Sequence, residues 1–189
     1  MSQNDYTITG RNGPSERANP RPPARPRVFV SYAHESDDHR RAVLSLCVLL
    51  VSCGVDVHVD RWYLEVRRDW QVWATRQILD ADFVLVVASE QCRQAGDGTG
   101  PVHGRLGLRS EMRLLRELYH ADPDTWTRRV LPVILPGRGV HEIPLFLQPR
   151  TADHYVVTSF TPEGADDLLR ILHGTPSCSP PTPHRLRLG

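Results

Sequence analysis

Short apolar runs along the chain predict the strands of a parallel sheet. Residues 27–32 and 82–89 are apolar over most of their length, as in central strands that are buried on both faces. Residues 55–60 instead alternate between valine and polar side chains, which indicates a half-exposed strand at the edge of the sheet. Two further strands are expected over residues 130–135 and 154–158.

Segments with helical periodicity separate these strands. A helix over residues 37–52 follows the N-cap candidate Ser36, and a second helix follows the N-cap candidate Asp69. Two more are expected over residues 105–119 and 162–172. Strands and helices that alternate in this way form a parallel sheet with helices on both faces. We therefore expect an α/β, flavodoxin-like three-layer sandwich whose five-stranded parallel sheet has the order 2-1-3-4-5.

The helix over residues 105–119 contains one residue that does not fit its pattern. Its leucines and Met112 fall on one side of a helical wheel, and its arginines fall on the other. Glu111 lies inside the apolar stripe, four residues before Leu115. Burying an unpaired carboxylate costs several kcal/mol, so this one should be paired, protonated or turned toward a cavity. Two interpretations stay open: a functional carboxylate, or a structural one that forms a salt bridge or lies at a partly exposed edge of the stripe.

The carboxyl ends of the strands are the expected ligand site. In doubly wound sheets, ligands bind there, near the switch between the first and third strands. In this chain the crevice would collect residues 31–34, the loop after Asp60, Ser89 and a glycine-rich loop over residues 94–107. That loop is longer than most connections, but it lacks the G-x-x-x-x-G-K-[ST] pattern of a nucleotide phosphate loop.

Three tryptophans lie around the second loop. Trp70 and Trp73, three residues apart on one predicted helix, are expected to pack in the core. Trp62 lies in the loop itself, where a large aromatic side chain serves either as a partner contact or as a lid over a ligand. Both roles for Trp62 stay open.

Composition removes several classes of function. The formal net charge is +1, so nothing global indicates binding to nucleic acid or to an anionic membrane. All 23 basic residues are arginine, which suits a high-GC bacterium and excludes every mechanism that needs a lysine. A phosphoacceptor receiver is excluded because it needs that lysine and an aspartate where the third strand ends in Ser89. A flavin site is disfavoured, because no Ser/Thr-rich phosphate loop follows the first strand.

The run of acidic residues and histidines after the first strand has two interpretations. It could hold a metal ion, or it could be a helix cap followed by solvated acids, and no complete ligand set stands out. We expect no metal and no resident cofactor. The run consists of His34, Glu35, Asp37, Asp38 and His39.

Cysteine usage and the ends of the chain indicate a cytoplasmic domain between two tails. No two of the four cysteines have CxxC spacing, so we expect reduced thiols. We find neither a secretory signal nor an apolar stretch of membrane-spanning length. Residues 1–26 and 174–189, rich in proline and polar residues, are expected to be disordered tails around one domain over residues 27–173. The cysteines are Cys47, Cys53, Cys92 and Cys178.

Several of these segments together resemble a known family. The chain is similar to SEFIR domains, relatives of the Toll/interleukin-receptor (TIR) domain, and specifically to the bacterial stand-alone type. The resemblance covers residues 27–119 well and residues 130–173 more loosely. It rests on the segments RVFVSYAHESDDHRRAV, GVDVHVDRWYLEVRRDWQVW, ADFVLVVASEQC and GLRSEMRLLRELY.

The resemblance implies two classes of function. Animal SEFIR and TIR domains are adaptors that pair with like domains, whereas bacterial and plant relatives include NAD⁺-consuming enzymes of anti-phage defence and cell death. In those enzymes the catalytic residue is a glutamate on the helix after the third strand, the place that Glu111 occupies here. The resemblance therefore implies an NAD⁺ glycohydrolase that self-assembly activates, with NAD⁺ as substrate, or a non-catalytic homotypic module. The signal would come either from an upstream sensor protein or from a trigger that the chain binds directly.

Each hypothesis assigns residues. For the enzyme, Glu111 would stabilise the oxocarbenium-like charge as nicotinamide leaves. For the module, Trp62 and the arginines of the same helix, Arg109, Arg113 and Arg116, would contact a second copy. For the enzyme, the pocket would be lined by Ser31, Tyr32, Ala33 and His34 and covered by Asp60, Arg61 and Trp62.

Overall fold

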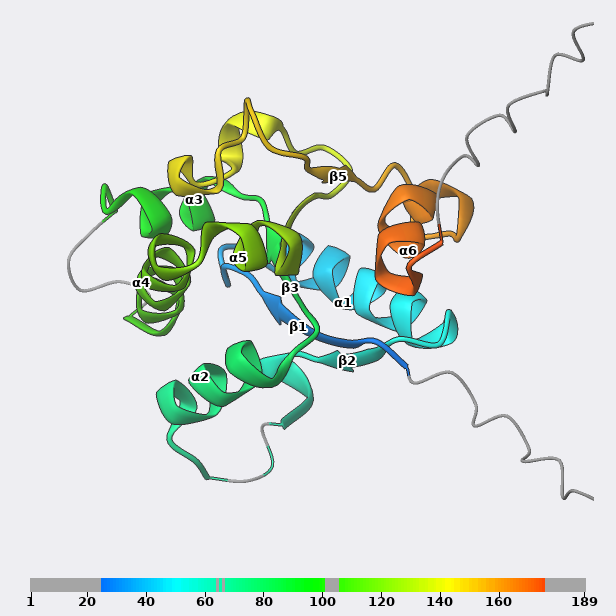
Figure 1. Ribbon diagram of the computed structural model, residues 1–189. Coiled ribbons are helices and arrows are strands. Elements are labelled where there is room, and N and C mark those ends of the chain that lie inside the picture. Colours follow the sequence, from blue (N-terminus) through cyan, green and yellow to red (C-terminus); the bar gives the residue numbers. More distant parts are fainter. Residues whose placement is uncertain (1–24, 64, 66, 101–105, 176–189) are drawn as a thin grey trace, which may run out of the picture.

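A five-stranded parallel sheet forms the centre of the computed structural model (Figure 1). The structure describes residues 25–63, 65, 67–100 and 106–175. The strand order is β2-β1-β3-β4-β5, and each neighbouring pair is parallel. The predicted fold class and order are thereby confirmed. The strands are β1 (Arg27–Ser31), β2 (Asp56–His58), β3 (Phe83–Val87), β4 (Val130–Ile134) and β5 (Tyr155–Val156).

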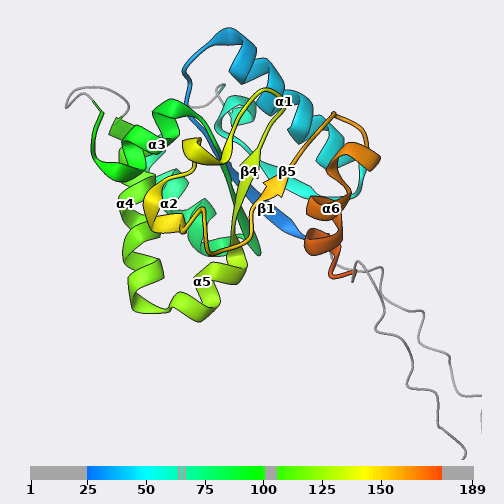
Figure 2. The ribbon, with the colours of Figure 1, turned by 90° about the horizontal axis from the view of Figure 1, so that it is seen from above.

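Helices cover both faces of the sheet (Figure 2). One face packs against α1 (Asp37–Ser52) and α6 (Asp166–His173), and its buried residues form one apolar cluster. The other face packs against the remaining helices around a second cluster. Alternate strand residues point to opposite faces, so Val28 and Val30 join the first cluster and Phe29 joins the second. The helices on the second face are α2 (Trp70–Asp80), α3 (Glu90–Asp97), α4 (Leu106–Ala121) and α5 (Pro123–Arg129).

Side-chain caps fix where four of these helices begin. Ser36 Oγ accepts a hydrogen bond from the backbone N–H of His39 at 3.1 Å, as expected from the sequence. Asp69 accepts from the N–H groups of Gln71 and Val72 and caps α2. Ser89 and Asp122 cap α3 and α5 in the same way, each accepting from the N–H three residues later.

Two helices correct the sequence interpretation. The expected glycine-rich loop over residues 94–107 begins inside α3, which runs to Asp97 before Gly98 ends it in the left-handed conformation at φ 74°. Gly96 lies in this helix directly against Pro144, where an added Cβ would come within 2.5 Å, so a larger residue does not fit there. The second unpredicted helix, α5, starts at a proline in its first turn, a known start signal.

Two predicted elements differ in detail. The last helix over residues 162–172 begins as a 3-10 turn, η4 (Glu163–Ala165), before α6. Pro132 lies inside β4 and pairs in register with Val86, although a proline has no N–H to donate to a neighbouring strand. The carbonyl of Ile134 accepts a hydrogen bond from the N–H of Val157, beside β5. Pro132, two residues earlier, faces the same side of β4 at a point where β5 has not yet begun, so its missing N–H costs no hydrogen bond between strands.

Some predictions lie partly or wholly outside the described residues. These are the tails, for which the structure describes only residues 25–26 and 174–175, the centre of the glycine-rich loop and Cys178. Cys47 and Cys92 are buried free thiols, and burial raises the pKa of Cys47 to about 12. Within the described ranges, none of the helices combines the length and apolar character needed to cross a membrane.

Candidate functional site

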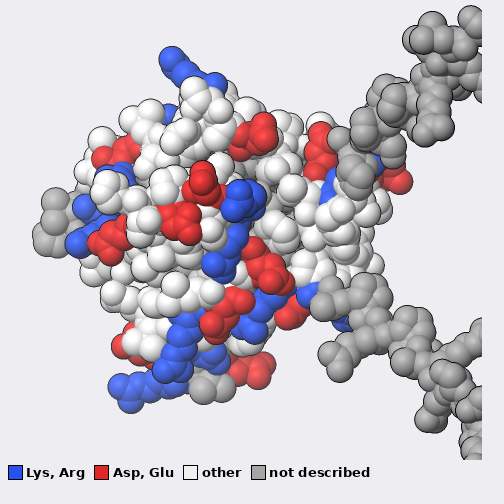
Figure 3. Space-filling model, in the orientation of Figure 1, with Lys and Arg blue, Asp and Glu red and all other residues white. Residues whose placement is uncertain are grey.

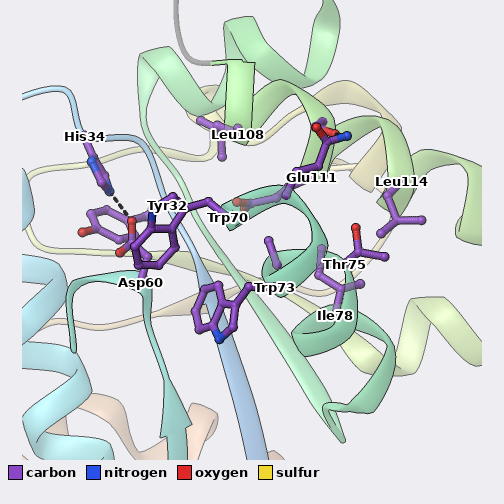
Figure 4. Close-up of a pocket in the computed structure, with 14 residues that line it drawn as sticks. Tyr32, His34, Asp60, Trp70, Trp73, Thr75, Ile78, Leu108, Glu111 and Leu114 are labelled. Atoms are coloured by element: carbon purple, nitrogen blue, oxygen red, sulfur yellow. Dashed lines mark hydrogen bonds and ion pairs between the residues drawn. The ribbon is translucent and has the colours of Figure 1, made fainter. Parts of the chain in front are cut away.

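A cavity of about 250 Å³ opens between α2 and α4, beside the carboxyl ends of β1 and β2 (Figure 4). The two helices contact each other, and the chain that leaves the two strands closes the third side. The predicted crevice at this edge of the sheet therefore exists, displaced toward α2 and α4. The cavity lining includes Tyr32, His34, Asp60, Trp70, Trp73, Ile78, Leu108 and Glu111.

Glu111 projects from α4 toward the end of β1. Ser31 follows Val30 in the strand alternation, faces the second apolar cluster and donates its hydroxyl to Oε2 of Glu111 at 2.5 Å. Burial raises the pKa of the Glu111 carboxyl group to about 7, and the nearby Asp60 adds to that rise. The Ser31 hydrogen bond and His34 act in the opposite direction. The Glu111 carboxyl group therefore lies at the cavity and is hydrogen-bonded to Ser31.

A histidine–aspartate pair forms the wall nearest the ends of β1 and β2. His34 Nε2 lies 2.8 Å from Asp60 Oδ2, and the ring of Tyr32 lies against His34 with centroids 4.7 Å apart. Burial, followed by the Asp60 carboxylate, raises the pKa of the Tyr32 hydroxyl. Among the described residues, neither Tyr32 Oη nor Asp60 Oδ1 has a hydrogen-bond partner, although both atoms are buried. This wall therefore holds two buried polar atoms, the Tyr32 hydroxyl and one Asp60 oxygen, close to each other.

Two tryptophans of α2 form the aromatic side of the cavity. Trp73 is half-buried and packs edge-on against Phe29 of β1. The prediction of core packing is wrong for Trp70, which is 38% exposed and meets Trp73 edge-on at 5.6 Å. The Arg68 guanidinium lies over Tyr63, Trp70 and Trp73, within 5.9 Å of each ring centroid. Cation–π attraction thereby holds the segment before α2 against its first turn.

The structure brings together only part of the predicted site. Tyr32, His34, Asp60 and Glu111 line the cavity, and Ser31 supports Glu111 from below. Ala33 is buried in the second apolar cluster instead of lining the cavity. Arg61 and Trp62 are exposed in η1 (Asp60–Tyr63) and are not part of the lining, with Trp62 42% exposed. The aromatic lining comes from Trp70 and Trp73, which sequence reasoning had assigned to the core.

An ion cluster lies beside the carboxyl ends of β1 and β3, where the strand order switches. The Glu35 carboxylate accepts a hydrogen bond from the backbone N–H of Gln91 in the first turn of α3 and pairs with Arg138. Arg138 also pairs with Glu142 at 3.0 Å, in the turn after β4. Burial alone would raise the pKa of Glu35, but Gln91, Ser89 and Arg138 together hold it below its usual value. These contacts tie together the segment after β1, the start of α3 and the turn after β4.

The residues of the suggested metal site are used elsewhere. Asp37 and Asp38 pair with arginines of their own helix, and Glu35 belongs to the ion cluster. His39 is buried, which lowers its pKa. In the part of the chain that the structure describes, no group of three or more His, Cys, Asp or Glu side chains could hold a metal ion.

Comparison with known proteins adds a family to this geometry. A family model described as the SEFIR domain matches residues 26–170, a span that contains all five strands and the whole cavity. A crystal structure of a prokaryotic SEFIR domain is similar to this chain, with 27% sequence identity and a TM-score of 0.61. The similarity covers 83% of this chain and 98% of that chain. No curated protein matches the chain.

Proposed function

The chain belongs to the SEFIR domain family, and from that premise we propose that it is a signalling or defence effector that cleaves NAD⁺ when it assembles. The observation that carries the proposal is the position of Glu111. Its carboxyl group faces a cavity, accepts a hydrogen bond from Ser31 and has a pKa of about 7. Perturbed carboxyl groups in clefts are typical of catalytic sites.

The reaction needs a negative charge where the glycosidic bond breaks. When nicotinamide leaves, the ribose carbon becomes oxocarbenium-like, and a nearby carboxylate stabilises that positive charge. Water then adds to the carbon, so the products are nicotinamide, ADP-ribose and a proton. With a pKa of about 7, a large share of Glu111 is ionised at neutral pH, and the share grows as the pH rises.

The walls of the cavity suit the two groups on either side of that bond. The nicotinamide ring of NAD⁺ is a cation, and the Trp70 and Trp73 rings already attract the Arg68 guanidinium. His34 and Asp60, which line the same cavity, suit hydrogen bonds with ribose hydroxyl groups. A volume of about 250 Å³ lies below the range for whole drug-sized ligands, so the cavity suits the nicotinamide–ribose end.

Nicotinamide release by concentrated protein, with and without a crowding agent, tests the proposal. We expect turnover by the wild type and a loss of about a hundredfold or more in Glu111→Gln. Glu163→Gln, which changes an exposed glutamate on the opposite face of the sheet, is the matched control and should behave as the wild type. Equal turnover in Glu111→Gln would show that Glu111 is not catalytic. If the wild type releases no nicotinamide under either condition, the enzyme proposal fails.

The alternative is a homotypic interaction module without catalysis. The exposed Trp62 favours it, because a large aromatic side chain outside the core marks contact surfaces. The arginine face predicted for this role is smaller than expected. Arg116 donates to the backbone carbonyl of Gly96 and lies over Phe146, so it holds α4 against α3. Arg109 and Arg113 remain on that face.

Light scattering over a concentration series tests assembly. We expect the mean mass of the wild type to rise with concentration and Trp62→Ala to reduce that rise. Phe160→Ala removes another partly exposed aromatic ring, near α6 on the opposite face, and serves as the control. A wild type that stays monomeric throughout, or a Trp62→Ala variant that assembles like the wild type, contradicts this role for Trp62.

A further inference from the structure

A second, larger hollow continues from the cavity along the outer side of α4. This groove has a volume of about 530 Å³ and also runs between α2 and α4. It shares four lining residues with the cavity, so the two spaces are neighbours. The shared residues are Gln71, Thr75, Ser110 and Leu114.

The shared wall is polar and is tied together across the two helices. The side-chain amide of Gln71 on α2 donates to Ser110 Oγ on α4 at 2.9 Å. Ser110 directly precedes Glu111 in the sequence. A ligand that extends past this hydrogen bond would therefore reach from the Glu111 carboxyl group in the cavity into the groove. The cavity and the groove are therefore separated by side chains, among them the hydrogen-bonded pair Gln71 and Ser110.

The groove differs from the cavity in its charge. Arg109 and Arg113, one helical turn apart on α4, both line it. Glu117 also lines it, one further turn along, so two cations and one anion face this space. Within the described part of the chain, no carboxylate forms an ion pair with Arg113. Two guanidinium groups on one helix face are the usual recognition elements for phosphate oxygens. Figure 3 shows acidic and basic side chains mixed over the face that carries α4 and α5, so these arginines act locally and not through a large positive field.

We propose that this groove is the subsite for the pyrophosphate of a dinucleotide substrate, held by Arg113 and Arg109 while the nicotinamide–ribose end occupies the cavity. The inference rests on the proposed NAD⁺ cleavage and adds where the rest of the substrate lies. The cavity is too small for the whole dinucleotide, and the adjoining groove supplies both the missing space and the positive charge. The subsite lies on α4 itself, so one chain supplies it.

Substrates that differ in their phosphates test the subsite. NAD⁺ carries the pyrophosphate, and nicotinamide riboside has the same glycosidic bond without any phosphate. For Arg113→Gln we expect the KM for NAD⁺ to rise about tenfold, and the KM for nicotinamide riboside to change by less than about twofold. Arg113→Lys keeps the charge and should recover part of the loss. Arg76→Gln, an exposed arginine of α2 outside the groove lining, is the control and should leave both KM values unchanged.

Direct binding separates this inference from the proposed function. Titration calorimetry with ADP-ribose measures the phosphate subsite without any cleavage, and we expect Arg113→Gln to weaken binding about tenfold. If the wild type does not cleave NAD⁺ but binds ADP-ribose in an Arg113-dependent way, the proposed function fails and the subsite stands. If NAD⁺ is cleaved and Arg113→Gln changes neither the KM for NAD⁺ nor ADP-ribose binding, the subsite is wrong. An equal rise in KM for both substrates also overturns it, because a general structural defect explains that result.

Discussion

Replacing Glu111 by glutamine is expected to stabilise the fold at alkaline pH and to leave its stability nearly unchanged at acidic pH. Glutamine has the same shape as the protonated carboxyl group, and its carbonyl oxygen can still accept the Ser31 hydrogen bond. It lacks the charge that burial penalises. The variant therefore isolates the free energy that the folded chain loses when Glu111 ionises.

The sign follows from the direction of the pKa shift. The folded chain holds the Glu111 proton up to a pKa of about 7, whereas the ordinary value is 4.5. Between these values the native state binds more protons than the unfolded state, so the free energy of unfolding falls as the pH rises. The difference between the two pKa values corresponds to a loss of about 3 kcal/mol in the free energy of unfolding once Glu111 is fully ionised above pH 7. This value is an upper bound for one carboxyl group.

Urea denaturation at a series of pH values, from about pH 4.5 to about pH 8.5, measures this effect. The unfolding free energy of Glu111→Gln minus that of the wild type should be near zero at the acidic end. It should rise toward about 3 kcal/mol at the alkaline end. Other groups titrate in both proteins and cancel in the difference. The exposed control Glu163→Gln should give a flat difference. A flat or falling difference for Glu111→Gln would refute the assignment of a desolvated carboxyl group.

Three further variants test neighbouring parts of the structure. Ser31→Ala removes the hydrogen bond that lowers the pKa of Glu111, so the pH profile of nicotinamide release should move about one pH unit or more to higher pH; an unmoved profile contradicts this role. Asp69→Ala removes the cap of α2 and should lower the unfolding free energy by about 1 kcal/mol in urea titrations, whereas Asp69→Ser should retain most of it. Arg138→Met leaves the buried Glu35 carboxylate without its cation and should cost about 3–5 kcal/mol, seen by circular dichroism as a lower melting temperature; a wild-type melting curve would show that the pair is not structural.

The sheet could be predicted because its signals are local. Valine at residues 55, 57 and 59 alternates with polar residues, and the structure buries all three valines at the edge strand β2. The continuously apolar runs around Val30 and Leu85 mark β1 and β3 as central strands. Once edge and centre are known, the alternation with helices leaves few strand orders open.

The missed elements depend on contacts that are distant in sequence. Gly96 looks like part of a loop, but it lies in α3 and packs against Pro144, which is 48 residues away. No local pattern contains that contact. The start of α5 was recognisable in principle, because Asp122 followed by proline is a cap and first-turn signal.

The candidate site was predicted in the same uneven way. Glu111 was found because a charge inside an apolar stripe is visible in the sequence. Which tryptophan faces the cavity was not visible, since it depends on how α2 rotates against α4. Trp70 and Trp73 turn toward that gap, whereas Trp62 in η1 points to solvent.

The ion cluster at the strand switch has a mechanical consequence. Glu35, Arg138 and Glu142 join the segment after β1, the start of α3 and the turn after β4 at one point. All three segments lie at the carboxyl ends of their strands, where ligands bind in doubly wound sheets. Here ion pairs and a hydrogen bond join these three segments to one another, whereas the segment before α2 carries Arg68, whose guanidinium lies over the rings of Tyr63, Trp70 and Trp73. We therefore expect the side of the site that carries Ser31 to stay rigid when a ligand binds, and the side that carries Trp70 to adjust.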